Sequence, residues 1–149
     1  MTTFKTSLAF FAFAVTVLFS ACNKDDETTV NGAFSNGIFV VNEGPFQNGT
    51  GTITYFNPDS NLVKQDIFET VNGRPLGNIA QNMSVYNGKA YIVVNNAGTV
   101  EVVDVATFKS EGTITNLINP SQFLVIDDKK AYVSDWVGHI AVVDLTTNT

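Results

Sequence analysis

Cysteine and histidine are almost absent from this 149-residue sequence, since each occurs once, as Cys22 and His139. A single cysteine excludes an internal disulfide framework and any zinc site built from several cysteines. The histidine has no serine or cysteine nucleophile beside it in the sequence, so the arrangement needed for nucleophilic catalysis is missing. We therefore expect no catalytic residues, no metal site and no cofactor, and we do not expect an enzyme.

Basic residues are scarce as well. Eight Lys and Arg residues stand against 14 Asp and Glu residues, which gives a formal net charge of −6. Binding to nucleic acid depends on many contacts between basic side chains and phosphates. The composition therefore excludes nucleic acid as a partner.

Long hydrophobic runs are also missing. The longest, residues 8–19, is about twelve residues, whereas a membrane-spanning helix needs roughly 20. Lys5 precedes this run, and the small residues Ser20 and Ala21 follow it. A positive start, a short apolar core and small residues are typical of a secretory signal peptide, which we predict over residues 1–21.

The only cysteine comes directly after this leader. Residues 18–22 read Leu-Phe-Ser-Ala-Cys and resemble the bacterial lipobox, in which the cysteine is diacylated and becomes the mature N-terminus. The resemblance implies that Cys22 is lipidated and anchors the protein in outer-membrane lipid, where acyl chains contribute about 0.8 kcal/mol per buried methylene. The alternatives are a plain secretory leader followed by an incidental cysteine, or a buried core thiol.

Residues 22–33 are predicted to form an acidic flexible tether, because they are charged and poor in apolar side chains. They begin Cys-Asn-Lys-Asp-Asp-Glu. This stretch resembles the Lys-Asp/Glu export signals of surface lipoproteins in Bacteroidetes. The resemblance implies that the protein is exposed at the cell surface.

The rest of the chain carries an internal repeat of about forty residues. Tyr91 and its neighbours match Tyr132 and its neighbours 41 positions later, and the phrase ending in Asp104 recurs 40 positions later, ending in Asp144. A third copy lies upstream. Its second half matches at a shift of 47, and its first half at a shift of 53, which aligns Asn42 with Asn95.

Each copy predicts four antiparallel strands. The apolar residues alternate or run continuously over four to seven positions rich in Val, Ile, Tyr and Thr, and Asn-Gly pairs suit the tight turns between them. For the best-defined copy we predict strands near 81–86, 89–94, 98–103 and 112–117. Four strands per forty residues are typical of a β-propeller blade. We predict an all-β fold with about three blades, a partial β-propeller over residues 34–149, with a β-solenoid as the main alternative.

Asn57, Asp104 and Asp144 share one position of the repeat. Asp or Asn at the end of a strand commonly accepts hydrogen bonds from the backbone of the following turn. We predict that these three residues are structural.

In such blades the loops between strands two and three lie on the same side as the connections between successive blades. These loops are rich in amides and carry two aromatic residues, a combination that suits a neutral, polar, partly flat ligand. The predicted ligand-binding residues are Asn42, Phe46, Asn78, Gln81, Asn95, Asn96, Gln122, Asp135 and Trp136.

The repeat phrases also carry a family resemblance. Residues 37–44, 51–55 and 88–96 (Gly-Ile-Phe-Val-Val-Asn-Glu-Gly, Gly-Thr-Ile-Thr-Tyr and Gly-Lys-Ala-Tyr-Ile-Val-Val-Asn-Asn) resemble those of the YncE-like, DUF5074-type surface lipoproteins of Bacteroidetes, which have YVTN-type repeats. Their best-understood, BtuG-like relatives are seven-bladed propellers that capture cobalamin and pass it to a TonB-dependent outer-membrane transporter. The resemblance implies a corrinoid or other large polar ligand and such a transporter as partners.

Two other functions remain open from the residues alone: a surface propeller that binds protein or glycan without a transport role, and a propeller enzyme. Beyond the leader and the tether, about 115 residues remain, just under three blades, whereas closed propellers have four to eight. We therefore expect the sequence to be the N-terminal part of a longer protein.

Overall fold

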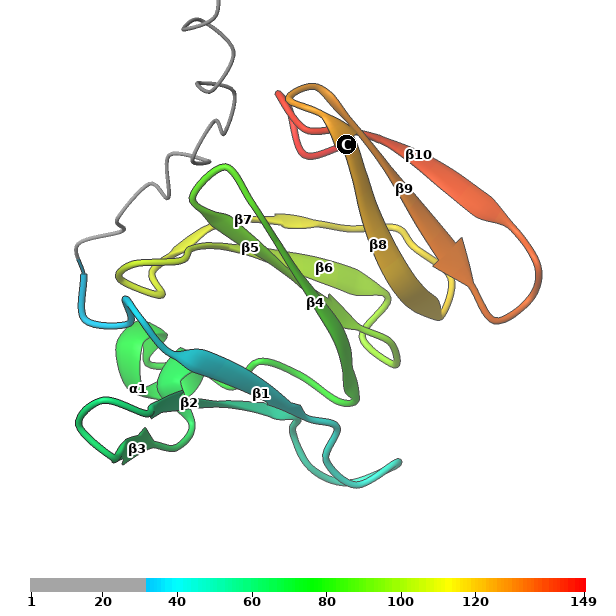
Figure 1. Ribbon diagram of the computed structural model, residues 1–149. Helices are drawn as coiled ribbons and strands as arrows, with labels where there is room; N and C mark the ends of the chain where they lie inside the picture. Colours follow the sequence, from blue (N-terminus) through cyan, green and yellow to red (C-terminus); the bar gives the residue numbers. More distant parts are fainter. Residues whose placement is uncertain (1–31) are drawn as a thin grey trace, which may run out of the picture.

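The computed structural model describes residues 32–149, which form three antiparallel sheets arranged side by side (Figure 1). Blade 1 contains β1 (Ile38–Asn42), β2 (Thr52–Asn57) and β3 (Leu62–Lys64). Blade 2 contains β4 (Ala80–Tyr86), β5 (Lys89–Val94), β6 (Thr99–Asp104) and β7 (Ser110–Ile114). Blade 3 contains β8 (Pro120–Asp127), β9 (Lys130–Asp135) and β10 (Ile140–Asp144). In each sheet every strand pairs with its neighbour in sequence, which confirms the blade topology. Blade 2 has the four predicted strands, whereas blades 1 and 3 have three each within residues 32–149.

In blade 2 the bounds of β4, β5 and β6 agree with the prediction to within one residue, whereas β7 begins two residues and ends three residues before the predicted 112–117. The Asn87-Gly88 turn joins β4 to β5, and both residues have positive φ, 47° and 76°. Asn and Gly are the residues that adopt this conformation at low cost, which is why the pair marks a tight hairpin. The alternation of side chains along β5 and β6 then supplies apolar residues to both faces of the sheet.

Each face of blade 2 packs against a neighbouring blade. Toward blade 1 it presents Ala90, Ile92 and Val103, which join a core that includes Ile53 and Tyr55. Toward blade 3 it presents residues such as Tyr91, whose ring stacks on Phe123 with centroids 4.7 Å apart. Burial of each large apolar side chain stabilises such a core by roughly 1.5–3 kcal/mol. The two interblade cores hold the arc together.

The first buried side chain of the described residues is Phe34, just before β1. Its N–H donates to the carbonyl of Ala106, 3.3 Å away. Its ring packs edge-on against Tyr55 and Phe108, at centroid distances of 5.3 and 5.7 Å. The predicted leader, Cys22 and nearly all of the predicted tether lie outside the described residues.

The register of β1 differs from the sequence alignment by one residue. Thr52 and Thr99 are equivalent by the repeat, and Thr52 pairs with Asn42 whereas Thr99 pairs with Val94. Asn42 is therefore equivalent to Val94, and the predicted alignment of Asn42 with Asn95 is wrong. A shift of one residue moves every side chain of a strand to the opposite face.

A short helix, α1 (Ile67–Asn72), interrupts the otherwise all-β chain between β3 and β4. It buries Ile67 and Phe68 in the core between blades 1 and 2. It ends at Gly73, whose φ is 67° and whose N–H donates to the carbonyl of Glu69. No helix of residues 32–149 is long and apolar enough to cross a bilayer.

Candidate functional site

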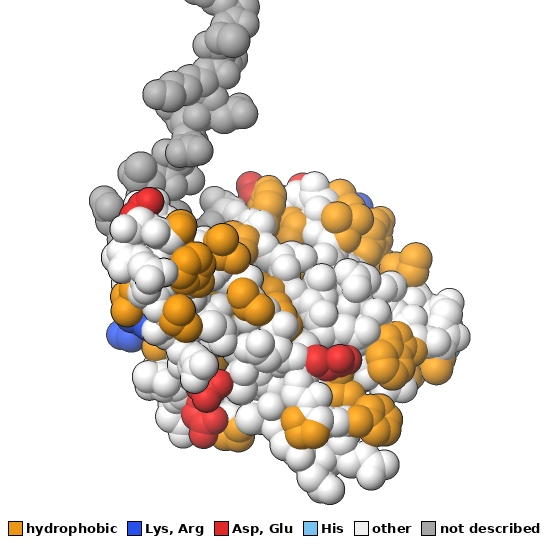
Figure 2. All heavy atoms as spheres, turned by 60° about the horizontal axis from the view of Figure 1, so that its bottom comes forward, with side chains coloured by type: hydrophobic (Ala, Val, Ile, Leu, Met, Phe, Trp, Pro, Cys, Tyr) orange, Lys and Arg blue, Asp and Glu red, His pale blue; other side chains and the backbone are white. Residues whose placement is uncertain are grey.

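The connections predicted to share one side of the molecule do so. We call this side the loop face. It comprises the β1–β2, β5–β6 and β9–β10 loops together with the β3–β4 and β7–β8 connections between blades. Figure 2 brings this side forward and shows hydrophobic side chains in separate groups with few basic ones.

Two residues that were predicted to bind a ligand, Asn78 and Asn96, connect three of these loops through their side-chain amides. Asn78, in the β3–β4 connection, donates from Nδ2 to the carbonyls of Pro45 and Gly49 at 2.9 and 3.1 Å. Its Oδ1 accepts a hydrogen bond of 2.9 Å from Nδ2 of the exposed Asn96. The structure thus brings Asn78 and Asn96 together as an amide cluster at the open surface of the loop face.

The backbone below this cluster is fixed by Thr50 and Gly77. The Thr50 hydroxyl donates to the carbonyl of Gly77 at 3.0 Å and accepts from its N–H at 3.0 Å. Gly77 has a φ of 122°, a region that residues with a side chain rarely adopt. The β1–β2 loop is therefore held against the blade 1–2 connection.

Asn95 and Asn42 do not contribute to the amide cluster. Asn95 is only 2% exposed, and its Nδ2 donates to the carbonyl of Pro120 at 2.8 Å. Asn42 lies at the end of β1 and donates to the hydroxyls of Thr52 and Thr54 on its own sheet. The expectation that Asn95 contacts a ligand is corrected, because its polar group is buried and paired between blades.

Gln81 and Gln122 lie at corresponding irregularities of the first strands of blades 2 and 3. The register of β4 shifts between Ala80 and Asn82, and that of β8 shifts between Pro120 and Gln122. Gln81 is half-buried, and among the described residues its Oε1 is a buried oxygen without a hydrogen-bond partner. Gln122 is exposed. Neither side chain reaches the amide cluster through a hydrogen bond in residues 32–149.

The two predicted aromatic residues are exposed on the loop face. Phe46, in the β1–β2 loop, is 62% exposed, and Trp136, in the β9–β10 loop, is 53% exposed. The N–H of Trp136 donates to the carbonyl of Asn119 at 3.2 Å, just as the N–H of Asn95 donates to Ile79. Trp136 therefore occupies the repeat position of Asn95 but points its large side chain toward solvent.

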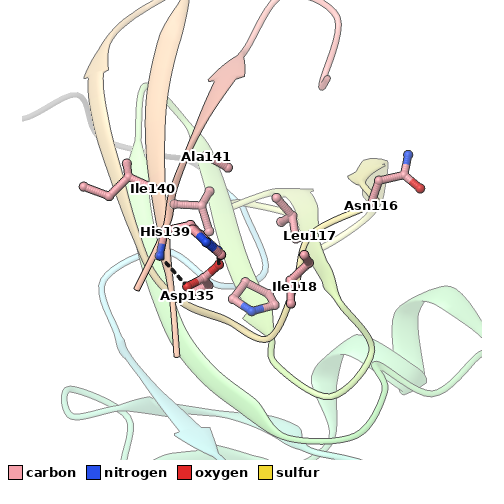
Figure 3. Close-up of a pocket in the computed structure, with 9 residues that line it drawn as sticks. Asn116, Leu117, Ile118, Asp135, His139, Ile140 and Ala141 are labelled. Carbon is pink, nitrogen blue, oxygen red and sulfur yellow. Dashed lines mark hydrogen bonds and ion pairs between the residues drawn. The ribbon is translucent and has the colours of Figure 1, made fainter. Parts of the chain in front are cut away.

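A cavity of about 250 Å³ opens between blades 2 and 3 (Figure 3). We call it the junction pocket. Its walls come from the β7–β8 connection, the first residue of β8 and the ends of β9 and β10. They include Asn116, Leu117, Ile118, Pro120, Asp135 and His139. Of the residues predicted to bind a ligand, Asp135 lines this pocket.

His139 is exposed, with 71% of its side chain accessible, and it pairs with Asp135. The imidazole Nδ1 lies 3.1 Å from Oδ2 of Asp135. Oδ1 of the same carboxylate accepts from the N–H groups of Val137 and His139 at 2.9 and 2.7 Å. The backbone N–H of His139 and then its imidazole hold the pKa of Asp135 below its ordinary value. The Asp-x-x-x-His spacing in one short loop was the sequence signal for this pair.

The residues predicted to be structural are confirmed on the opposite side. The N–H groups of Ser60, Thr107 and Thr146 donate to the side-chain oxygens of Asn57, Asp104 and Asp144, respectively, at 2.8–3.0 Å. Each bond closes the turn that follows its strand. Within residues 32–149 no group of three or more His, Cys, Asp or Glu side chains could hold a metal ion.

Three blade-like sheets with a shared loop face define part of a β-propeller. The family described as "Domain of unknown function (DUF5074)" matches residues 36–149, and the chain belongs to this family. A comparison with curated proteins finds no match.

One solved structure shows the same fold at low identity, and a second is similar over a comparable share of the chain. A europium-containing methanol dehydrogenase is 14% identical, with a TM-score of 0.51 over 76% of this chain and 22% of that one. Apo AztD from Citrobacter koseri is 18% identical, with a TM-score of 0.44 over 77% of this chain and 33% of that one. The chain thus spans a third or less of either structure.

Proposed function

We propose that this chain belongs to a lipid-anchored, cell-surface β-propeller that captures a large polar ligand on its loop face. The observation that carries the proposal is the amide cluster of Asn78 and Asn96, placed on the same face as the exposed rings of Phe46 and Trp136. Asn78 donates both of its Nδ2 protons to the carbonyls of Pro45 and Gly49, so it positions Asn96, whose exposed amide offers an uncharged donor and acceptor. Exposed rings offer flat apolar contact. Membership in the DUF5074 family supports a ligand-binding propeller.

Cobalamin is the ligand that we propose first, with a TonB-dependent outer-membrane transporter as the recipient. A corrinoid is large, mostly neutral and lined with amide groups, and it therefore matches amide donors and acceptors on the loop face. The scarcity of basic side chains on this face also favours a neutral ligand over an anion.

Titration of the protein with cobalamin, followed by calorimetry and by the absorption spectrum of the corrinoid, tests this function. We expect binding that weakens at least tenfold in Asn96→Ala and in Trp136→Ala. Lys129→Ala, in the exposed β8–β9 turn on the opposite side, is the matched control and should bind as the unmodified protein does. No heat and no spectral change with the unmodified protein would refute the cobalamin proposal.

A surface propeller that binds glycan without transport is the second candidate, and the exposure of Phe46 and Trp136 favours it. Sugar rings pack on exposed aromatic faces, and neighbouring amides bind their hydroxyls. A glycan array distinguishes the two candidates. If the unmodified protein binds a glycan that Trp136→Ala does not bind, and does not respond to cobalamin, the glycan-binding function is supported.

The membrane anchor is tested separately. We propose that Cys22 is acylated, so labelled palmitate should enter the protein in a bacterial host that processes lipoproteins. Cys22→Ser should lose the label and leave the membrane fraction. Equal labelling of both proteins would refute the anchor without bearing on the loop face.

A further inference from the structure

The two interblade junctions are built on the same plan but differ on the loop face. At the blade 1–2 junction the buried Leu76 belongs to the core, and Val94 is fully buried. A Cβ at Gly77 would lie 2.9 Å from Cγ1 of Val94, so the backbone already closes this space. At the blade 2–3 junction the corresponding space is the junction pocket of about 250 Å³.

The strand register identifies the residue that changes between the two junctions. Ala80 pairs with Val94 at the start of blade 2, and Pro120 pairs with Asp135 at the start of blade 3. Asp135 therefore occupies the position of the fully buried Val94. Blades 1 and 3 thus place a polar residue, Asn42 and Asp135, where blade 2 uses an apolar core residue, and a carboxylate at a packed junction needs polar partners.

The Asp135 carboxylate fixes the orientation of the imidazole. Its Oδ1 is already engaged by two backbone N–H groups, and its Oδ2 faces Nδ1 of His139 (Figure 3). An ionised carboxylate only accepts hydrogen bonds, so Nδ1 carries the proton. An imidazole that carries its single proton on Nδ1 has its lone pair on Nε2. Carboxylate–histidine pairs of this kind orient an imidazole toward a ligand.

The remaining walls are mostly apolar, with Asn116 as a further polar residue. Leu117 and Ile118 come from the β7–β8 connection, Pro120 begins β8, and Val133 and Ala141 come from β9 and β10. A cavity of about 150 Å³ lined by apolar side chains is large enough for benzene. The junction pocket is larger, so its volume suits a bicyclic aromatic group.

We propose that the junction pocket is a subsite for a compact bicyclic aromatic group that carries one N–H or O–H, which donates to Nε2 of His139. The proposal rests on the proposed function, because it assigns one part of a larger ligand to a place on the loop face. Trp136, in the same loop as His139, lies exposed at this end of blade 3 and is available to contact the rest of that ligand.

Indole and 1-methylindole form a matched pair of probes, because they differ in the single N–H. Nuclear magnetic resonance titration of the full protein with each probe measures the affinity. We expect indole to bind the unmodified protein at least fivefold more tightly than 1-methylindole, and His139→Phe to remove this difference. Asp135→Asn keeps an acceptor for the two backbone N–H groups but not for Nδ1, and it should also reduce the difference.

Ile118→Trp tests the location of the site. Ile118 is exposed, so a larger side chain there fills the mouth of the pocket without disturbing a core. We expect at least a tenfold loss of indole affinity, whereas Val137→Ala, in the same loop as His139 but outside the pocket, should bind normally. Equal affinity of indole for the unmodified protein and Ile118→Trp, or no binding by either, would overturn the proposal.

The outcomes for the pocket and for the proposed function are separable. If the unmodified protein binds cobalamin and Ile118→Trp binds it equally well, the pocket is not a subsite for that ligand and the proposed function stands. If indole binds as expected but neither cobalamin nor any glycan binds, the pocket stands and the proposed function fails.

Discussion

The side chain of Asn95 donates a hydrogen bond of 2.8 Å to the carbonyl of Pro120 and thereby ties the β5–β6 loop of blade 2 to the first residue of blade 3. Both groups are withdrawn from water, since Asn95 is almost fully buried and Pro120 is buried. A buried carbonyl that loses its donor is left without a partner at a site that water does not reach. This bond is therefore part of the joint between two blades.

We predict that Asn95→Ala destabilises the protein by about 1–3 kcal/mol, the usual cost of leaving a buried polar group unpaired. Urea unfolding followed by circular dichroism measures the change. Asn96→Ala, at the exposed neighbouring position, is the matched control and should change the free energy of unfolding by no more than about 0.5 kcal/mol. Equal stability of the two variants would show that the buried bond does not hold the junction.

A second prediction concerns the buried carboxylate of Glu101. Glu101 is 2% exposed, and its Oε1 lies 2.5 Å from Nη2 of Arg74 and also accepts from the Ser110 hydroxyl. Its Oε2 accepts from the Thr113 hydroxyl at 3.0 Å. Arg74→Met removes the only cation within salt-bridge distance in residues 32–149 and leaves the charge buried.

We expect Arg74→Met to cost about 1–3 kcal/mol, less than for a fully buried pair because the arginine side chain is half exposed. Adding Glu101→Gln to this variant should recover part of the loss, since a neutral amide is less costly to bury. Urea unfolding of the single and double variants measures both effects. A double variant less stable than Arg74→Met would contradict this account of the pair.

A third prediction concerns acid stability. The hydroxyl and N–H of Thr107 hold the pKa of Asp104 below its ordinary value of 3.8, and those of Thr146 do the same for Asp144. Because the folded carboxylates bind protons less readily than the unfolded ones, their contribution is complete above the unfolded pKa and is lost as the pH falls through the folded one.

Asp104→Asn combined with Asp144→Asn should therefore flatten the dependence of stability on pH between about pH 5 and pH 2. Blade 1 already uses Asn57 at this position, with its Oδ1 accepting from the N–H of Ser60 at 3.0 Å, so the turns should persist. Urea midpoints measured across this pH range test the prediction. If stability falls with pH as steeply in the double variant as in the unmodified protein, the prediction is contradicted. Asp59→Asn, at an exposed turn position, is the control.

A fourth prediction concerns the face of blade 3 that points away from blade 2. Ile140 and Val142 on β10 are 68% and 64% exposed, whereas their repeat equivalents on β6, Val100 and Val102, are fully buried. Exposed apolar side chains on a sheet face promote association. Ile140→Thr with Val142→Thr should reduce light scattering of the concentrated protein. Val137→Thr, an exposed loop position, should not, and equal scattering of both would refute the prediction.

The sheet that the sequence describes best is blade 2. Its repeat phrases and the Asn87-Gly88 turn placed β4 and β5 within one residue of their observed bounds. The register of β1 was missed for a physical reason. Residues 38–41 are apolar at every position, so two registers bury equally hydrophobic side chains, and the long β1–β2 loop does not choose between them. Pairing with β2 decides the register, and only the structure shows it.

The loop face was predicted from topology, and Asn78 and Asn96 were correctly placed on one side of the molecule. The burial of Asn95 and the junction pocket were not predicted. Both depend on how closely a connection between blades lies against the next blade. This distance is set by the sizes of the side chains packed at the junction and cannot be inferred from the type of a single residue. Helix α1 was missed because its six residues are too few to show a helical period.

The connections between blades have a further consequence. Fifteen residues, 65–79, join blade 1 to blade 2, whereas five residues, 115–119, join blade 2 to blade 3, yet the strands on either side pair in the same way. The sheets and the crossings are therefore separable modules. Replacing residues 65–79 by the five-residue connection 115–119 should therefore create a pocket at the blade 1–2 junction. The binding properties of each junction can then be changed by exchanging its connection alone.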